Sequence, residues 1–179
     1  MKLVRTSQLS ARYDELTAAT NDQLLVEHYI DHSEDGHPTE YRVLSLFGRA
    51  LYCARNRWGH KRPPLAEIAA DPFGIIASNN ATMGGRIRSI CGDPEIISLG
   101  QRAHQAFPEC PVIGVDIIRE SQSGRLHVLE ANPHGAVWHL SSPLAKKMDQ
   151  KHVRELYAQF NALDLAAELL IQKTRTDAC

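Results

Sequence analysis

Apolar and polar positions alternate most clearly in the middle of the chain. The stretch YRVLSLFGRALYCARN has the β-branched and aromatic residues of two strands, 41–47 and 50–56, around a turn at Gly48-Arg49. Upstream, the apolar run DQLLVEHYI, residues 22–30, has the length of a buried strand and is followed by a polar turn region. The pattern therefore predicts a β-hairpin and a strand that precedes it.

A helix start is well marked at Asp93. Its side chain suits the N-cap, Pro94 suits the first helical position, and Glu95 complements the positive end of the helix. Pro108 and Pro111 end the helical segment, because proline cannot continue a helix. The apolar stripe predicted for this helix is Ile96, Leu99, Ala103 and Phe107.

The C-terminal region has a longer helical period. Asp149 can cap it, and its apolar residues step alternately by three and four positions. The pattern predicts one long helix that packs against the domain's own sheet and ends in a frayed tail, 173–179. The predicted apolar face is Val153, Leu156, Phe160, Leu163, Ala167 and Leu170.

The remaining segments predict less regular structure. Thr6 can cap a short N-terminal helix, 59–74 is predicted to be a loop with one helical turn, and 75–85 turns tightly at its Gly-Gly. Together the patterns predict an α+β fold, a mostly antiparallel sheet packed by helices. We expect residues 1–145 to form one domain and the helical segment 146–179 to pack on it.

Composition and charge argue against several classes of protein, namely nucleic-acid-binding, membrane, zinc-binding and disulfide-rich proteins. The 179 residues fit one domain or one domain with a small attachment, and the net charge of −1 gives no sign of nucleic-acid or membrane-surface binding. No apolar run approaches the roughly 20 residues of a membrane span. The four cysteines are scattered without a CxxC pair, which argues against a zinc site or a disulfide scaffold. We expect a cytoplasmic protein with reduced thiols and no nucleic-acid or membrane partner.

The stretch GVDIIRESQSGRLHVLEANPHG predicts a second hairpin, with its turn at 121–124, and carries acids among its apolar residues. Strand alternation puts Glu130 and Asn132 on one face, and Asp116 lies on the preceding strand. A plain four-residue loop would pair Asp116 with Leu129, whereas a five-residue loop or a glycine bulge would pair it with Glu130. We predict the second register, because it alone gathers the three oxygen donors.

Three oxygen donors on one sheet face suit a hard cation. Mg²⁺ prefers oxygen ligands, often one or two carboxylates together with substrate phosphates. Without a cation, two close carboxylates would repel each other and one would be driven to protonate. Two simpler interpretations stay open, namely solvent-exposed hairpin positions and a capping role for Asn132. A nuclease of the PD-(D/E)xK type is a further alternative, although Asn132 stands where its lysine should be.

This second hairpin resembles the closing motif of the ATP-grasp superfamily, an Asp strand followed by a strand that reads L-E-x-N-P. Other stretches resemble family motifs in the same order. LLVEHYID resembles the strand that links the two halves of the ATP site, EYRVLSLFGRALYCARNR the D-x-R-x-x-V-x-G-x-x-V hairpin, and SNNATMGG the N-x-x-x-G-G segment. The series covers residues 24–140 and implies a partial ATP-grasp fold of the glutamate-ligase-like or D-alanine–D-alanine ligase-like branch.

The resemblance implies a metal site and a phosphate site. Its metal ligands would be Asp116, Glu130 and Asn132, holding Mg²⁺, or alternatively Mn²⁺, against the phosphates of ATP. Arg42 and Arg57 match catalytic arginines that face the phosphates or the acyl-phosphate intermediate, and their planar forks suit such contacts. The alternative for both arginines is a solvated hairpin face.

The resemblance also implies residues that bind the rest of ATP. Glu27 would accept from the adenine amino group, and the backbone around Tyr29 and Ile30 would bind the ring edge. Asn80 matches the motif asparagine near the metal side.

The chemistry of the family needs no covalent nucleophile from the protein. A carboxylate substrate attacks the γ-phosphate of ATP, and an amine or thiol then displaces phosphate from the acyl phosphate. The loop after Pro133 borders the acceptor substrate in the family, so His134, Trp138 and His139 would form a substrate wall. Packing or surface roles for these three residues remain the alternative.

The beginning of the family pattern is missing from the chain. In the family, a lysine-bearing strand and a glycine-rich phosphate loop precede the linking strand, whereas here 23 residues without glycine precede LLVEHYID. We expect the C-terminal portion of a carboxylate ligase, with weak affinity for ATP and catalysis by this chain alone left open. The alternatives are a non-catalytic or degenerate nucleotide-binding remnant and a partner chain that supplies the missing half. A homodimer is also left open.

Overall fold

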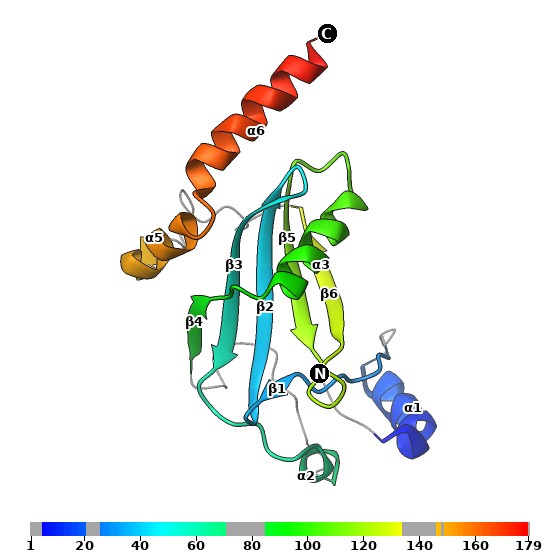
Figure 1. Cartoon of the computed structure of the whole chain (residues 1–179). Helices are drawn as coiled ribbons and strands as arrows, with labels where there is room; N and C mark the ends of the chain where they lie inside the picture. Colours follow the sequence, from blue (N-terminus) through cyan, green and yellow to red (C-terminus); the bar gives the residue numbers. More distant parts are fainter. Residues whose placement is uncertain (1–4, 21–25, 71–84, 134–145, 148, 179) are drawn as a thin grey trace.

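The fold is an antiparallel β-sheet packed by helices, and a helix ends the chain (Figure 1). The protein is represented by a computed structural model. It describes residues 5–20, 26–70, 85–133, 146–147 and 149–178. The chain is therefore an α+β protein, as the sequence predicted.

All strand pairings in the described part of the sheet are antiparallel. The sheet has the order β4-β3-β2-β5-β6, and the short strand β1 pairs with β2 beside it. The strands are β1 (Ser33–Glu34), β2 (His37–Leu46), β3 (Arg49–Trp58), β4 (Arg86–Ile90), β5 (Val112–Arg119) and β6 (Leu126–Asn132).

The first predicted hairpin is confirmed, with its turn one residue earlier than expected. Leu46 pairs with Arg49, so Phe47 and Gly48 form the turn, with φ angles of 46° and 80°. Two successive positive φ angles are typical of the tight turns whose twist matches that of a hairpin. Gly48 adopts this conformation without strain, which explains why the glycine marks the turn.

Two strand predictions need correction. Residues 26–30, the described part of the strand predicted at 22–30, are not in a strand. The carbonyl of Ile30 lies within hydrogen-bond distance, 3.2 Å, of His32 Nδ1, whereas a strand would need a neighbouring strand as partner. Conversely, β4 forms directly after Gly85, where the sequence analysis predicted no strand.

The helices of the described residues are short except at the C-terminus. A 3-10 turn (Thr6–Gln8) leads into α1 (Leu9–Thr20), and the single helical turn expected at 59–74 is present as α2 (Leu65–Ala70). The remaining helices are α3 (Pro94–Gln105), α5 (Gln150–Ala158) and α6 (Ala162–Asp177).

The start of α3 matches the prediction, but its buried stripe does not match in full. The Asp93 carboxylate accepts from the Glu95 backbone N–H at 2.9 Å, as an N-cap should. Ile96 is buried, whereas Phe107 is exposed because α3 ends at Gln105. The stripe faces the sheet through Ile96, Gly100 and His104.

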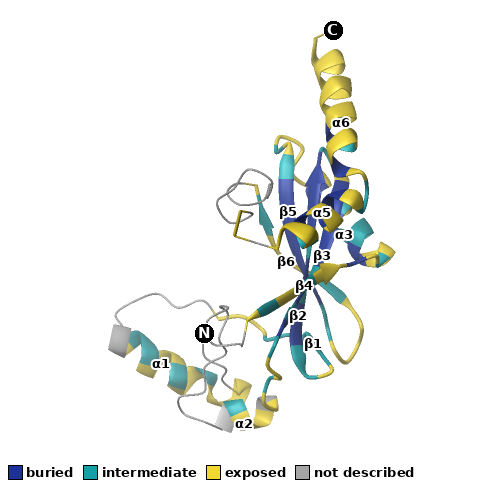
Figure 2. Cartoon of the chain, turned by 90° about the vertical axis from the view of Figure 1, so that its left-hand side faces the viewer, coloured by how far each residue is buried: buried dark blue, intermediate teal, exposed yellow. Residues whose placement is uncertain are grey.

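The long C-terminal helix predicted from the sequence is two helices. Asp149 caps α5 as expected, but Asn161 has a left-handed backbone, with φ of 50°, and ends the helical path. Because of this break, the side of α6 that faces the sheet is not the side that one continuous helix would present. Leu163 and Leu170 are therefore exposed. Figures 1 and 2 show α6 leading away from the sheet with most of its surface exposed.

The two faces of the sheet contribute to different core clusters. On one face α3 packs over a cluster that includes Val43, Val115 and Ile117. On the other face α5 and the first turns of α6 pack over a cluster that includes Leu44 and Tyr52. Among the described residues, no helix combines the length and apolarity that a membrane crossing requires.

Candidate functional site

Asp116 lies opposite Glu130 across β5 and β6, in the register that the sequence predicted. The chain reaches this register by a different route. Nearer the turn, Ile117 pairs with Val128, and that pairing alone would place Asp116 opposite Leu129. A β-bulge leaves Leu129 without a cross-strand partner and shifts the ladder by one residue. Neither the five-residue loop nor a glycine was needed.

The side chains of Asp116, Glu130 and Asn132 meet on one face of the sheet. Asn132 Nδ2 lies 2.9 Å from Glu130 Oε1 and 3.3 Å from Asp116 Oδ2, so one amide donates to both carboxylates. Asp116 is 6% exposed, and Arg42 on β2 lies beside it. Arg42 Nε donates to Asp116 Oδ1 at 2.6 Å, and Nη2 donates to Oδ2. This is the paired fork geometry that makes arginine–carboxylate contacts strong.

The pKa values of the two carboxyls are shifted in opposite directions. Burial raises the pKa of Asp116, although the Arg42 guanidinium acts against this. Hydrogen bonds with Asn132 and with Asp116 lower the pKa of Glu130. A positive charge placed between the two carboxyls would favour the ionised form of both.

Further charged residues lie on this face, and the sequence analysis missed them. β4 contributes Arg86 and Arg88, and β2 contributes Glu40, whose carboxylate lies 3.2 Å from Arg86. Arg86 also stacks on Trp58, with 4.9 Å between the guanidinium carbon and the ring centre. The alternation Arg86-Ile87-Arg88 is too short to predict a strand by itself. The charged face, as we call it, consists of Glu40, Arg42, Arg86, Arg88, Asp116, Glu130 and Asn132.

Arg57 does not lie on the charged face. Arg42 pairs with Ala54 on β3, and strand alternation then points Arg57 to the opposite side of the sheet. Its Nε is buried without a hydrogen-bond partner. The structure therefore separates two arginines that the sequence analysis had grouped.

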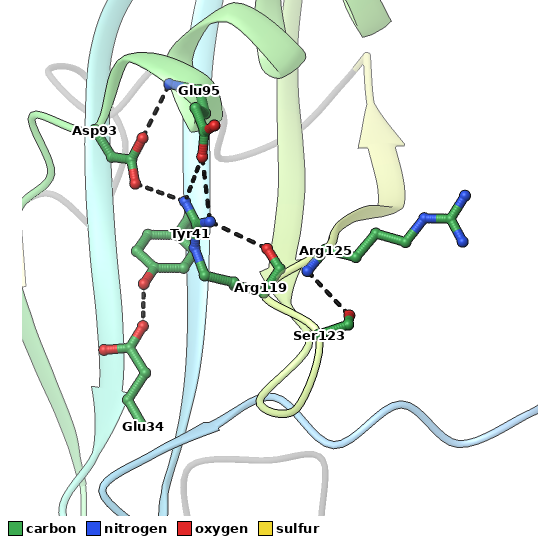
Figure 3. Close-up of polar contacts among 8 residues, drawn as sticks. Glu34, Tyr41, Asp93, Glu95, Arg119, Ser123 and Arg125 are labelled. Atoms are coloured by element: carbon green, nitrogen blue, oxygen red, sulfur yellow. Dashed lines mark hydrogen bonds and ion pairs between the residues drawn. The ribbon is translucent and has the colours of Figure 1, made fainter.

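The opposite face has its own polar cluster, at the start of α3 (Figure 3). Arg119 Nη2 donates to Asp93 Oδ2 at 2.6 Å, and Arg119 Nη1 donates to Glu95 Oε2 at 3.2 Å. Tyr41 donates to Glu34 below them. Because these acids are paired with donors of the same cluster, their contacts hold α3 against β5.

The segment that follows the residues predicted to bind adenine is tied to the turn between β5 and β6. The Ser121 backbone N–H donates to the Asp31 carbonyl at 2.8 Å, which ties the segment before β1 to this turn. Glu27 is exposed and Tyr29 is half-buried. Within the described ranges, no hydrogen bond or ion pair joins Glu27, Tyr29 or Ile30 to the charged face.

Some predicted site residues fall outside the described part of the chain, namely Asn80, His134, Trp138 and His139. Among the residues that are described, no group of three or more His, Cys, Asp or Glu side chains could hold a metal ion. The predicted metal group contains two residues of these types, Asp116 and Glu130, and takes its third donor from Asn132.

Comparisons with known proteins find similarity among solved structures. No family model matches the chain, and no curated protein sequence matches it. Among solved structures the chain is similar to the crystal structure of D-alanine–D-alanine ligase from Bacillus anthracis, with 13% sequence identity and a TM-score of 0.37. The similarity covers 93% of this chain and 50% of the ligase, so the chain spans half the length of that protein.

Proposed function

We propose that this chain is the ATP- and Mg²⁺-binding C-terminal part of an ATP-grasp ligase. Such a ligase joins a small carboxylate to an amine or thiol through an acyl phosphate. The ordered sequence motifs support the proposal. The observation that carries it is the bulge at Leu129, which sets Asp116 opposite Glu130 while Asn132 bridges their carboxylates.

The donor set at this position fits Mg²⁺. It offers two carboxylates and an amide, and a half-turn of the Asn132 amide would present its oxygen in place of its nitrogen. Asp116, Glu130 and Asn132 would hold the ion. When bound, Mg²⁺ would neutralise charge on the ATP phosphates and on the transferring phosphoryl group.

Arg42 supports the ionised form of Asp116. Its guanidinium lowers the pKa that burial raises, and its loss would leave a buried carboxylate without a positive neighbour. The same planar fork suits phosphate oxygens. In this proposal Arg42 is the arginine that faces the phosphates, and Arg57 on the other face takes no part.

The substrate side of the proposal rests on sequence alone. His134, Trp138 and His139 would border the acceptor substrate, and Asn80 would lie near the metal. Glu27, Tyr29 and Ile30 would bind adenine after a rearrangement of the segment that leads to β1. The identity of the acid and of the nucleophile is left open.

Calorimetry with Mg²⁺–ATP tests the proposal. We expect measurable binding of Mg²⁺–ATP to the wild type and at least tenfold weaker binding to Glu130→Gln. The reason is that loss of one charged ligand removes about 1.5–3 kcal/mol of binding free energy. Glu109→Gln, an exposed change outside the charged face, serves as the matched control and should bind like the wild type. Equal affinities for the wild type and Glu130→Gln would exclude the metal assignment.

A further inference from the structure

We propose that Arg88 forms the centre of an oxyanion subsite on the charged face, at the β3–β4 side of the sheet. The subsite would take a phosphate or carboxylate group. This inference deepens the proposed function, on which its ligand class rests, because it adds a substrate-binding residue that no sequence motif indicated.

The first observation is that Arg88 has no acceptor among the described residues. It is half-buried on β4, opposite Asn56 of β3. Within the described residues no hydrogen bond and no ion pair reaches its guanidinium. A partly desolvated guanidinium without an acceptor loses hydration and gains nothing in return, so an external anion would stabilise it.

The second observation is that the charged side chains near Arg88 include two further positive charges, Arg86 and Arg42. Burial lowers the pKa of Arg88, and the nearby charges of Arg86 and Arg42 lower it further. Two acids of the charged face are already engaged, since Glu40 lies 3.2 Å from Arg86 and Asp116 accepts from Arg42. The third acid, Glu130, lies on β6 at the opposite edge of the sheet from β4. Arg88 is therefore the arginine of the charged face that contacts no carboxylate of the described residues.

The third observation is that the neighbouring cross-strand pair, Trp58 and Arg86, contains N–H donors without acceptors in the described part of the chain. Trp58 pairs with Arg86 directly beside the pair formed by Asn56 and Arg88, on the same face. Arg86 Nε and Trp58 Nε1 are buried, and neither has a hydrogen-bond partner. Both atoms can only donate. A cluster of donors around an uncompensated arginine selects an oxyanion rather than a cation or an apolar group.

Two sources could supply this oxyanion in the proposed reaction. One is a phosphate group of the nucleotide, and the other is the carboxylate of the acid substrate. Inorganic pyrophosphate and succinate represent the two sources and can be titrated separately. Both titrations are carried out in EDTA, so that binding does not depend on a metal at Asp116 and Glu130.

Calorimetry on the full chain compares the wild type with Arg88→Gln. We expect Arg88→Gln to bind pyrophosphate, succinate or both roughly tenfold to a hundredfold more weakly than the wild type. Arg88→Lys keeps the charge but loses the planar fork, so its affinity should fall between the two. Arg102→Gln on α3, which contacts Ser98 at 3.0 Å and not the charged face, is the matched control. Circular dichroism verifies that each variant is folded.

The outcomes separate this inference from the proposed function. If Arg88→Gln binds only pyrophosphate more weakly than the wild type, the subsite is assigned to a nucleotide phosphate. If it binds only succinate more weakly, the subsite is assigned to the carboxylate of the acid substrate. Equal binding of both probes by the wild type and Arg88→Gln, or no binding of either probe by the wild type, overturns the subsite. Glu130→Gln should bind the metal-free anions at least as well as the wild type, even though it fails in the Mg²⁺–ATP test.

Discussion

Gly100 is a residue at which the backbone of α3 lies directly against Val43 of β2. A Cβ at this position would lie 2.5 Å from the Cβ of Val43, far inside the 3.5–4.0 Å at which carbon atoms attract each other. The glycine therefore allows the helix backbone to lie directly on β2. The sequence analysis did not single it out, because glycine inside a helical pattern signals close packing only once the partner strand is known.

Gly100→Ala should destabilise the fold. Alanine favours the helix by about 1 kcal/mol, but overpacking costs about 1–3 kcal/mol and the neighbouring backbone has little room to move. Urea unfolding of the variant should give a lower free energy of unfolding than the wild type. Gly92→Ala, where no atom lies within 4 Å of the added Cβ, should change it by less than about 0.5 kcal/mol. If the clash is the cause, Gly100→Ala should cost less in a Val43→Ala background.

Glu40 gives the charged face a pH dependence. Burial raises the pKa of this carboxyl above 4.5, and the attraction of Arg86 only partly offsets the effect. A carboxyl with a raised pKa stabilises the folded state while it is protonated, and this contribution is lost as the pH rises through the raised pKa. Glu40→Gln cannot ionise and should therefore gain thermal stability relative to the wild type between pH 4 and pH 7.

Thermal melts at several pH values measure this effect. The melting temperature of the wild type minus that of Glu40→Gln should fall as the pH rises through this range. Glu109→Gln, exposed and remote from the charged face, should show no comparable trend. A constant difference for Glu40→Gln, or one that grows with pH, would contradict the pKa direction.

At the scale of elements, the bulge in β6 controls which residues face the proposed metal site. Leu129 is the extra residue of the bulge and is exposed. Its deletion should leave Asp116 opposite Glu130, because the paired residues on either side then follow each other in a regular ladder. Deletion of Ala131, which is paired with Val115, should instead move Asn132 to the other face.

These two deletions make a matched pair. We expect the chain without Leu129 to fold and to bind Mg²⁺–ATP within about threefold of the wild type, since the donor set is unchanged. The chain without Ala131 should bind at least tenfold more weakly, because a ligand is lost. Calorimetry decides between them, and similar losses in both variants would show that the register does not control the site.

The elements that could be predicted from the sequence are those with local signals. Gly48 needs a positive φ, and Asp93 with Pro94 starts α3, so the hairpin and the helix start follow from neighbouring residues alone. The break at Asn161 and the strand β4 depend on the packing of α5 and on pairing with β3, which no local pattern contains. The register at Asp116 was predictable because only one pairing gathers the oxygen donors, although the position of the bulge was not.

At the scale of the whole molecule, the sheet separates two kinds of surface. α3 covers one face with an apolar cluster and a closed set of ion pairs at its start. On the other face, the described helices α5 and α6 pack over one apolar cluster, and the described residues beyond it include the charged ones. The sequence analysis singled out Arg42 and the predicted metal ligands, which lie on this face, but it missed Arg86 and Arg88, because β4 becomes visible only as part of the sheet.

The central claim is that a divalent ion with ATP binds between β5 and β6. Paramagnetic broadening by Mn²⁺–ATP in NMR spectra of the ¹⁵N-labelled chain locates the ion directly. We predict the strongest broadening at the amides of Asp116 and Glu130, weaker broadening at Asp93 on the far face, and loss of the effect in Glu130→Gln. Broadening centred on Asp93 and Glu95, or a pattern unchanged by Glu130→Gln, would contradict the claim.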